Sequence, residues 1–93
     1  MGEHARLVFS TAADAVLADK LCALGVGKAG DIERETFPDG ERGLRIISPV
    51  ADADAFLVGG TGSDADTLEL YDLACALVES GVHALTLVVP YFG

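Results

Sequence analysis

The sequence predicts an α/β domain in which a parallel sheet carries an antiparallel hairpin, with the element order β-α-β-β-β-α-β. Two stretches with apolar residues at helical spacing separate short apolar runs that are typical of buried strands. An Asp-Gly pair, Asp39-Gly40, joins two alternating stretches as hairpin turns do. Because strands joined through helices run parallel with right-handed crossovers, the hairpin is expected as an antiparallel insertion or edge.

The first strand and helix are predicted from residues 6 to 25. Arg6–Ser10 is a short apolar strand, and Thr11 can cap the helix after it, with Asp14 at the reciprocal position of a capping box. Gly25 stands where a left-handed terminator ends a helix. The inward face of this helix is predicted to consist of Ala13, Leu17, Leu21 and Leu24.

The remaining elements follow the same logic. Asp31–Phe37 and Arg42–Ile47 alternate as half-exposed strands, and Ala55–Val58 is a short buried strand. A second helix is predicted from Asp64 to Ser80, ended by Gly81, and Ala84–Val89 is the last strand. The inward face of the second helix is predicted to be Leu70, Leu73, Leu77 and either Ala74 or Val78.

The last strand leads to Gly93, where an α/β sheet presents functional loops and an autonomous domain adds a covering helix. Residues 1–93 are therefore expected to be one incomplete half-domain, truncated at Gly93. Composition fits a folded chain, since 51% of the residues are hydrophobic and 23% are charged. The longest apolar run, Ala84–Val89, is too short for a membrane span, and no secretory signal is visible, so a cytoplasmic protein is predicted.

The net charge excludes some classes of binding partner, and the positions of the cysteines predict their redox state. Fifteen Asp and Glu against six Lys and Arg give a net charge of -9, which repels nucleic acid and anionic membranes. Cys22 and Cys75 lie within apolar helical patterns, which predicts buried, reduced thiols. His4 and His83 are isolated in the sequence, so no zinc site is predicted.

The segment Gly60–Ala65 fits the glycine pattern G-x-G-x-x-A of a nucleotide-binding turn. Asp64 and Asp66, however, occupy the helix N-terminus where a pyrophosphate would sit, so a capped structural loop is favoured and a dinucleotide cradle is the alternative. Together with Asp52 and Asp54 these carboxylates could gather a hard cation, but capping and solvation explain them, and no metal site is predicted. No serine has a paired His and acid at recognisable spacing.

The turn segment FPDGE leaves two interpretations open. A plain hairpin explains Asp39 and Gly40 and is preferred on the residues alone. An exposed Phe37 beside Asp39 and Glu41 would instead offer a ring for stacking and acceptors for an exocyclic amine, as a purine base requires.

Three motifs resemble the N-terminal part of the ribose-phosphate diphosphokinases, the phosphoribosyl pyrophosphate synthetases. That family commonly has F-S-[DN]-G-E on a hairpin, M-E-L on the next helix and V-I-P-Y-F-G at the end of the next strand. This chain has FPDGE at 37–41, LEL at 68–70 and VVPYFG at 88–93. The match covers all 93 residues in order and spacing, but only the first part of a family member.

The resemblance implies a phosphoribosyltransferase-like, Rossmann-like fold. It also implies transfer of diphosphate from Mg-ATP to ribose 5-phosphate, giving phosphoribosyl diphosphate and AMP, with Mg²⁺ required and with homodimers or larger homo-oligomers. Residues matching Phe37, Asp39 and Glu41 contact the ATP adenine in the active site of a neighbouring subunit.

Some features of the family pattern are expected outside these residues, and others are replaced within them. The family's basic segment, metal-positioning His and catalytic loop follow the P-Y-F-G strand, so no catalytic residue is expected within Met1–Gly93, and this segment alone cannot catalyse. Pro49–Asp52 replaces the S-V-R-G of phosphate-activated members, which predicts no phosphate-dependent regulation of that kind. Gly59–Gly62 replaces the Q-S-[TG]-S-type loop. A divergent enzyme is therefore predicted, and a catalytically silent regulatory or scaffold subunit is the alternative.

Overall fold

The computed structural model describes residues 4–36, 38–40 and 42–90. Its elements in chain order are β1 (Arg6–Ser10), the 3₁₀ turn η1 (Ala12–Asp14), α1 (Ala15–Ala23), β2 (Lys28–Ala29), β3 (Ile32–Thr36), β4 (Arg42–Ile46), β5 (Asp54–Val58), α2 (Asp64–Glu79) and β6 (Ala84–Val88). The α/β fold with a parallel sheet and an antiparallel hairpin is confirmed. The sequence did not predict β2, which has two residues and carries no apolar pattern.

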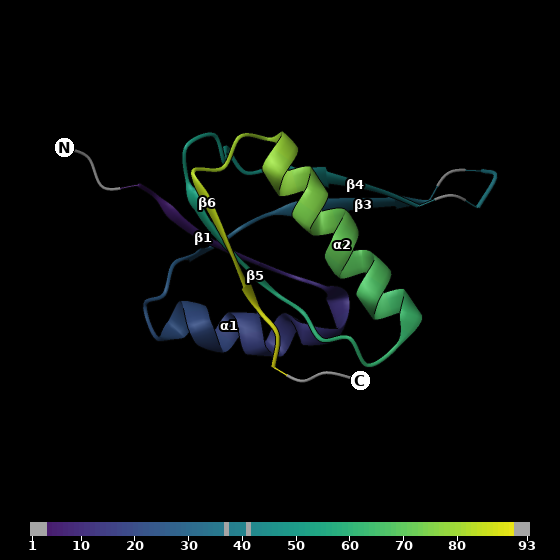
Figure 1. Cartoon of the computed structure of the whole chain (residues 1–93), viewed down its shortest axis with the longest axis horizontal. Helices are drawn as coiled ribbons and strands as arrows, with labels where there is room; N and C mark the ends of the chain where they lie inside the picture. Colours follow the sequence, from purple (N-terminus) through teal and green to yellow (C-terminus); the bar gives the residue numbers. More distant parts are fainter. Residues whose placement is uncertain (1–3, 37, 41, 91–93) are drawn as a thin grey trace.

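The strands form a parallel sheet in the order β2-β1-β5-β6 and a separate antiparallel sheet of β3 and β4. Figure 1 shows α1 on one side of the parallel sheet and α2 on the other. Because alternate residues of a strand point to opposite faces, Phe9 packs in the cluster with α2 while its neighbour Val8 packs in the cluster with α1. The hairpin is inserted in the chain between β2 and β5 and is not an edge strand of the parallel sheet.

The core under α2 follows the predicted helix face. Leu70, Leu73 and Leu77 are buried as expected and pack against Leu57 of β5. Complete burial of such a side chain contributes about 1.5–3 kcal/mol. The fourth inward residue is Ala74, whereas Val78 is 60% exposed.

The predicted apolar face of the first helix is wrong at both ends. Ala13 is exposed in η1, and Leu24 is 79% exposed just after α1. The buried residue is Ala18, with Leu17 and Leu21 partly buried beside it. A 3₁₀ turn has three residues per turn, so Ala13 is out of phase with a continuous α-helical pattern. Leu24 is exposed because it lies beyond Ala23, the last residue of α1.

The helix ends differ from prediction in one respect. The capping box at Thr11 and Asp14 is wrong, because neither side chain caps a helix backbone N–H. Instead, the Thr11 hydroxyl donates to Asp14 Oδ2 over 3.4 Å. Gly25 and Gly81 have φ values of 85° and 87°, so both glycines end their helices in the left-handed region as predicted.

The hairpin stands apart from the parallel sheet. β3 and β4 pair from Ile32↔Ile46 to Thr36↔Arg42, and Gly40 in the connecting turn has a φ of 88°. Ile32, Leu44 and Ile46 pack against the core under α2. Figure 1 shows the two strands running outward past α2, so that one end of the hairpin is rooted in the core and the other projects from the molecule.

Candidate functional site

The turn between β3 and β4 carries one described residue of the predicted adenine-binding set. Asp39 is exposed in the turn. Phe37 and Glu41 lie outside the described residues. The structure therefore describes one of the three predicted residues. The contacts that hold the hairpin in place lie nearer the end that is rooted in the core.

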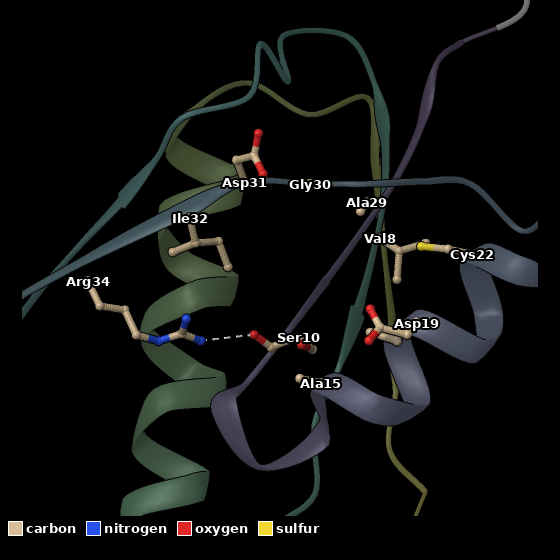
Figure 2. Close-up of a pocket in the computed structure, with 11 residues that line it drawn as sticks. Val8, Ser10, Ala15, Asp19, Cys22, Ala29, Gly30, Asp31, Ile32 and Arg34 are labelled. Carbon is tan, nitrogen blue, oxygen red and sulfur yellow. Dashed lines mark hydrogen bonds between the residues drawn. The ribbon is translucent and has the colours of Figure 1, made fainter.

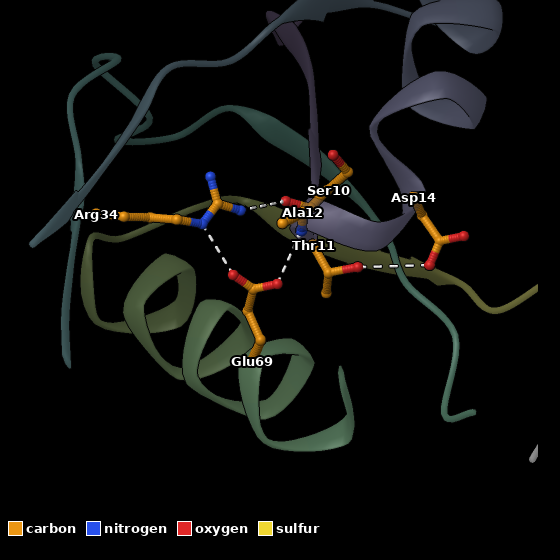
Figure 3. Close-up of polar contacts among 6 residues, drawn as sticks. All are labelled: Ser10, Thr11, Ala12, Asp14, Arg34 and Glu69. Atoms are coloured by element: carbon orange, nitrogen blue, oxygen red, sulfur yellow. Dashed lines mark hydrogen bonds and ion pairs between the residues drawn. The ribbon is translucent and has the colours of Figure 1, made fainter. Parts of the chain in front are cut away.

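A polar network joins that base to the rest of the molecule (Figure 3). Arg34 of β3 donates from Nε to Oε2 of Glu69 on α2 over 2.8 Å, and from Nη2 to the carbonyl oxygen of Ser10 over 3.1 Å. Oε1 of Glu69 accepts a 2.8 Å hydrogen bond from the backbone N–H of Ala12. One carboxylate thus connects the hairpin, α2 and the turn after β1. The sequence motif at 68–70 marked Glu69 but could not show what it binds.

A second network lies at the carboxyl ends of β1 and β5, where parallel α/β sheets commonly bind ligands. Oδ2 of Asp14 accepts the backbone N–H of Gly60 over 2.8 Å, and the backbone N–H of Thr11 donates to the carbonyl of Val58 over 3.0 Å. Asp14 is 9% exposed and Thr11 is fully buried. The first glycines of the GGTG segment are therefore held against the β1–α1 turn.

The same segment is closely packed and capped. A Cβ on Gly59 would come within 2.7 Å of Leu70 Cδ1 and 2.9 Å of Thr11 Cγ2. The Oγ of Ser63 caps α2 by accepting the backbone N–H of Asp66 over 3.1 Å. This geometry favours the capped structural loop, although Ser63 makes the cap while Asp64 and Asp66 occupy the first turn.

Two hollows flank Arg34. One, of about 620 Å³, lies between the hairpin and α2, and its walls include Leu44, Leu68 and Asp72. Glu35 and Gly43, which are paired in the ladder, also line this groove. The other, of about 240 Å³, lies on the α1 side and is shown in Figure 2 with Arg34 at its edge.

The described carboxylates at 52, 54, 64 and 66 have other neighbours in the fold. In the described part of the chain, no group of three or more His, Cys, Asp or Glu side chains could hold a metal ion. Asp52 and Asp54 instead contact histidines: His4 Nδ1 lies 2.8 Å from the carbonyl oxygen of Asp52, and His83 Nδ1 lies 2.8 Å from Oδ1 of Asp54. His4 and His83, predicted to be isolated, stack with ring centroids 3.7 Å apart.

Cys22 and Cys75 are free thiols, as predicted, but both are half-buried instead of buried. Cys75 lies one turn after Tyr71 on α2, and Tyr71 is exposed. A hydrogen bond with Cys75 and the negative charge of its thiolate raise the pKa of the Tyr71 phenol above its ordinary value.

The fold is that of the phosphoribosyltransferase-like α/β proteins. The structure superposes on phosphoribosylpyrophosphate synthetase from Mycobacterium smegmatis with a TM-score of 0.81 at 20% identity, over 94% of this chain and 30% of that one. A hypoxanthine phosphoribosyltransferase from Staphylococcus aureus gives a TM-score of 0.66 at 14% identity, over 99% and 53% of the two chains. At these identities the likeness shows the fold.

The sequence gives the family. Residues 6–93 match the N-terminal domain of ribose phosphate pyrophosphokinase, and the chain belongs to this family. The chain is 36% identical over 88 residues to a ribose-phosphate pyrophosphokinase of Porphyromonas gingivalis, and 32% identical over 88 residues to one of Thermotoga maritima. Each match covers 92% of this chain and 28% of the relative. In the part of the chain that the structure describes, no helix is long and apolar enough to cross a membrane.

Proposed function

We propose that this chain is the adenine-binding part of a ribose-phosphate diphosphokinase. The enzyme transfers diphosphate from Mg-ATP to ribose 5-phosphate and releases phosphoribosyl diphosphate and AMP. Family membership over residues 6–93 supports the reaction. The projection of the hairpin beyond α2 supports the role of this part, because it carries residues 38–40 away from the chain's own parallel sheet (Figure 1).

The chemistry of the turn suits a base. Phe37 supplies a ring for stacking, while Asp39 and Glu41 supply acceptors for the exocyclic amine of adenine. A phosphate would be repelled by the same carboxylates. The outward direction of the strands suits delivery of these groups to a neighbouring subunit, so a homodimer or larger homo-oligomer is part of the proposal.

Mg²⁺ enters this proposal with the triphosphate of ATP. The residues that the structure describes offer no ligand set for the ion, and its charge neutralises the transferred phosphates when it is bound. The contribution of this chain's own residues is to bind and orient the base. The residues that carry out the transfer are expected outside Met1–Gly93, and the cytoplasmic location stays a prediction.

The test is steady-state kinetics of the natural protein with Phe37→Ala. The apparent KM for ATP should rise roughly tenfold or more, because stacking of one base on an aromatic ring contributes about 1–3 kcal/mol. The KM for ribose 5-phosphate should stay within about twofold of that of the unmodified protein, because a loss of adenine binding does not alter the ribose 5-phosphate site. Asp19→Asn, which alters an exposed carboxylate on α1, is the matched control. Unchanged ATP dependence in the Phe37 variant would contradict the proposal.

An AMP-release assay separates the enzyme from the silent subunit. The unmodified protein should release AMP when ATP, Mg²⁺ and ribose 5-phosphate are supplied together, and not when the sugar phosphate is left out. A protein that binds ATP through the hairpin but releases no AMP would instead be the regulatory or scaffold subunit.

A further inference from the structure

We infer that Glu69 is a positioning residue that fixes the hairpin, and so determines where its turn meets the adenine of ATP. This inference rests on the adenine-binding role proposed for the turn. Glu69 touches no residue of the turn in the bonds described above. Its two carboxylate oxygens instead hold Arg34 on the hairpin and the backbone of Ala12 beside β1, each over 2.8 Å.

Because of where Arg34 lies along the hairpin, its bond to Glu69 can determine the tilt of the hairpin. The apolar contacts with the core come from Ile32, Ile46 and Leu44, and Leu44 is the ladder partner of Arg34. The Arg34–Leu44 rung is therefore the outermost rung with a contact to the core or to α2 given above. From Arg34 to Asp39 an extended chain spans roughly 17 Å, so a tilt of about 10° at this rung moves the turn by about 3 Å.

Apolar contacts alone do not define that tilt. Burial of apolar surface is non-directional, so the packing of Ile32, Leu44 and Ile46 on the core does not by itself select one orientation of the hairpin. Hydrogen bonds to charged groups are short and directional. Arg34 is held at two points by its planar guanidinium, by Glu69 Oε2 at 2.8 Å and by the Ser10 carbonyl at 3.1 Å, which fixes both its distance and its plane.

Burial sets this carboxylate apart from an ordinary surface ion pair. The side chain of Glu69 is 22% exposed, and both its oxygens have partners on other elements. The hairpin supplies a matched comparison in Glu33 and Arg45, which lie 3.6 Å apart with side chains 46% and 72% exposed. That pair joins β3 to β4 and does not tie the hairpin to α2 or β1.

The first test is a pair of isosteric variants, Glu69→Gln and Glu33→Gln, in the natural protein. Glu69→Gln loses one acceptor and the charge, and should raise the apparent KM for ATP about fivefold to tenfold, because small misplacements of binding groups are costly. Both kcat and the KM for ribose 5-phosphate should stay within about twofold, since neither the chemistry nor the sugar site is altered. Glu33→Gln should change none of the three. Equal effects of the two variants would overturn the inference.

The second test reads position without activity. Spin labels at Pro38→Cys in the turn and Val78→Cys on α2 report the distance between the hairpin turn and α2, in a background from which every native cysteine, Cys22 and Cys75 included, has been removed. Glu69→Gln should shift or broaden that distance distribution, and Glu33→Gln should leave it unchanged. An unaltered distribution in Glu69→Gln refutes the positioning role.

The two proposals fail in different ways. If Phe37→Ala raises the KM for ATP and Glu69→Gln does not, the adenine clamp stands and the positioning inference is wrong. If Phe37→Ala leaves ATP dependence unchanged, the clamp itself is wrong, whatever the spin labels report about Glu69.

Discussion

The backbone N–H of Gly60 donates to the Oδ2 of Asp14 over 2.8 Å, between residues 46 positions apart in the sequence. This bond ties the loop after β5 to the turn after β1, at the edge where the parallel strands end. Because Asp14 is 9% exposed, its carboxylate depends on this donor and on the Thr11 hydroxyl in place of water. Asp14 therefore stabilises the loops at the edge of the sheet where ligands of α/β proteins commonly bind.

Asp14→Ala should lower the free energy of unfolding by about 2 kcal/mol, because it leaves the Gly60 N–H and the Thr11 hydroxyl without their charged acceptor. Urea denaturation followed by circular dichroism measures the change. Asp19→Ala, at an exposed position on α1, should stay within about 0.5 kcal/mol of the unmodified chain. An equal loss of unfolding free energy in both variants would show that the Asp14–Gly60 hydrogen bond contributes no specific stabilisation.

Gly59→Ala and Gly62→Ala should differ in their effect on stability. A Cβ at Gly59 meets Leu70 and Thr11 within 3 Å, and Thr11 is fully buried, so Gly59→Ala should destabilise the chain by about 1–3 kcal/mol. Gly62 is exposed, and Gly62→Ala should change neither stability nor ATP binding. Calorimetric titration with ATP provides the second readout. Loss of nucleotide binding in Gly62→Ala would revive the dinucleotide cradle.

Tyr71 should ionise at a higher pH than an ordinary tyrosine, because the hydrogen bond with Cys75 and the charge of its thiolate raise the pKa of the phenol. A folded-state pKa above the unfolded value favours folding below pH about 10, and this contribution is lost as the pH rises through the folded pKa. Ultraviolet titration of the 93-residue chain in a Tyr91→Phe background isolates the Tyr71 phenol. Cys75→Ala should move the midpoint down towards the ordinary value, and an unmoved midpoint would refute this cause.

Activity should not depend on inorganic phosphate as an activator. Pro49–Asp52 supplies neither the hydroxyl nor the guanidinium of the S-V-R-G pattern. Val50 is 3% exposed, and Asp52 turns the chain with a φ of 63°. The measurement is AMP release by the natural protein across a phosphate series at constant ionic strength. A rise of about tenfold with phosphate would mean that other residues form the regulatory site.

Much of the secondary structure could be predicted because its signals are local. Apolar runs gave β1, β5 and β6 within one residue, and the Asp-Gly pair gave the hairpin. The helix ends at Gly25 and Gly81 were predicted correctly, because a left-handed backbone conformation favours glycine at that one position. The family likewise followed from short motifs at fixed spacing and is confirmed over residues 6–93. The adenine contacts at Phe37, Asp39 and Glu41 stay predictions.

Tertiary structure alone decided which groups meet. Local patterns assigned Asp14 to a capping box and left His4 and His83 isolated, whereas the fold gives Asp14 to Gly60 and stacks the two rings. The bonds from Glu69 to Ala12 and Arg34 have the same origin, because they join residues 57 and 35 positions apart. A sequence period specifies which face of an element is buried, but it holds no information about which distant donor a carboxylate will reach. That choice depends on how the sheet and helices pack.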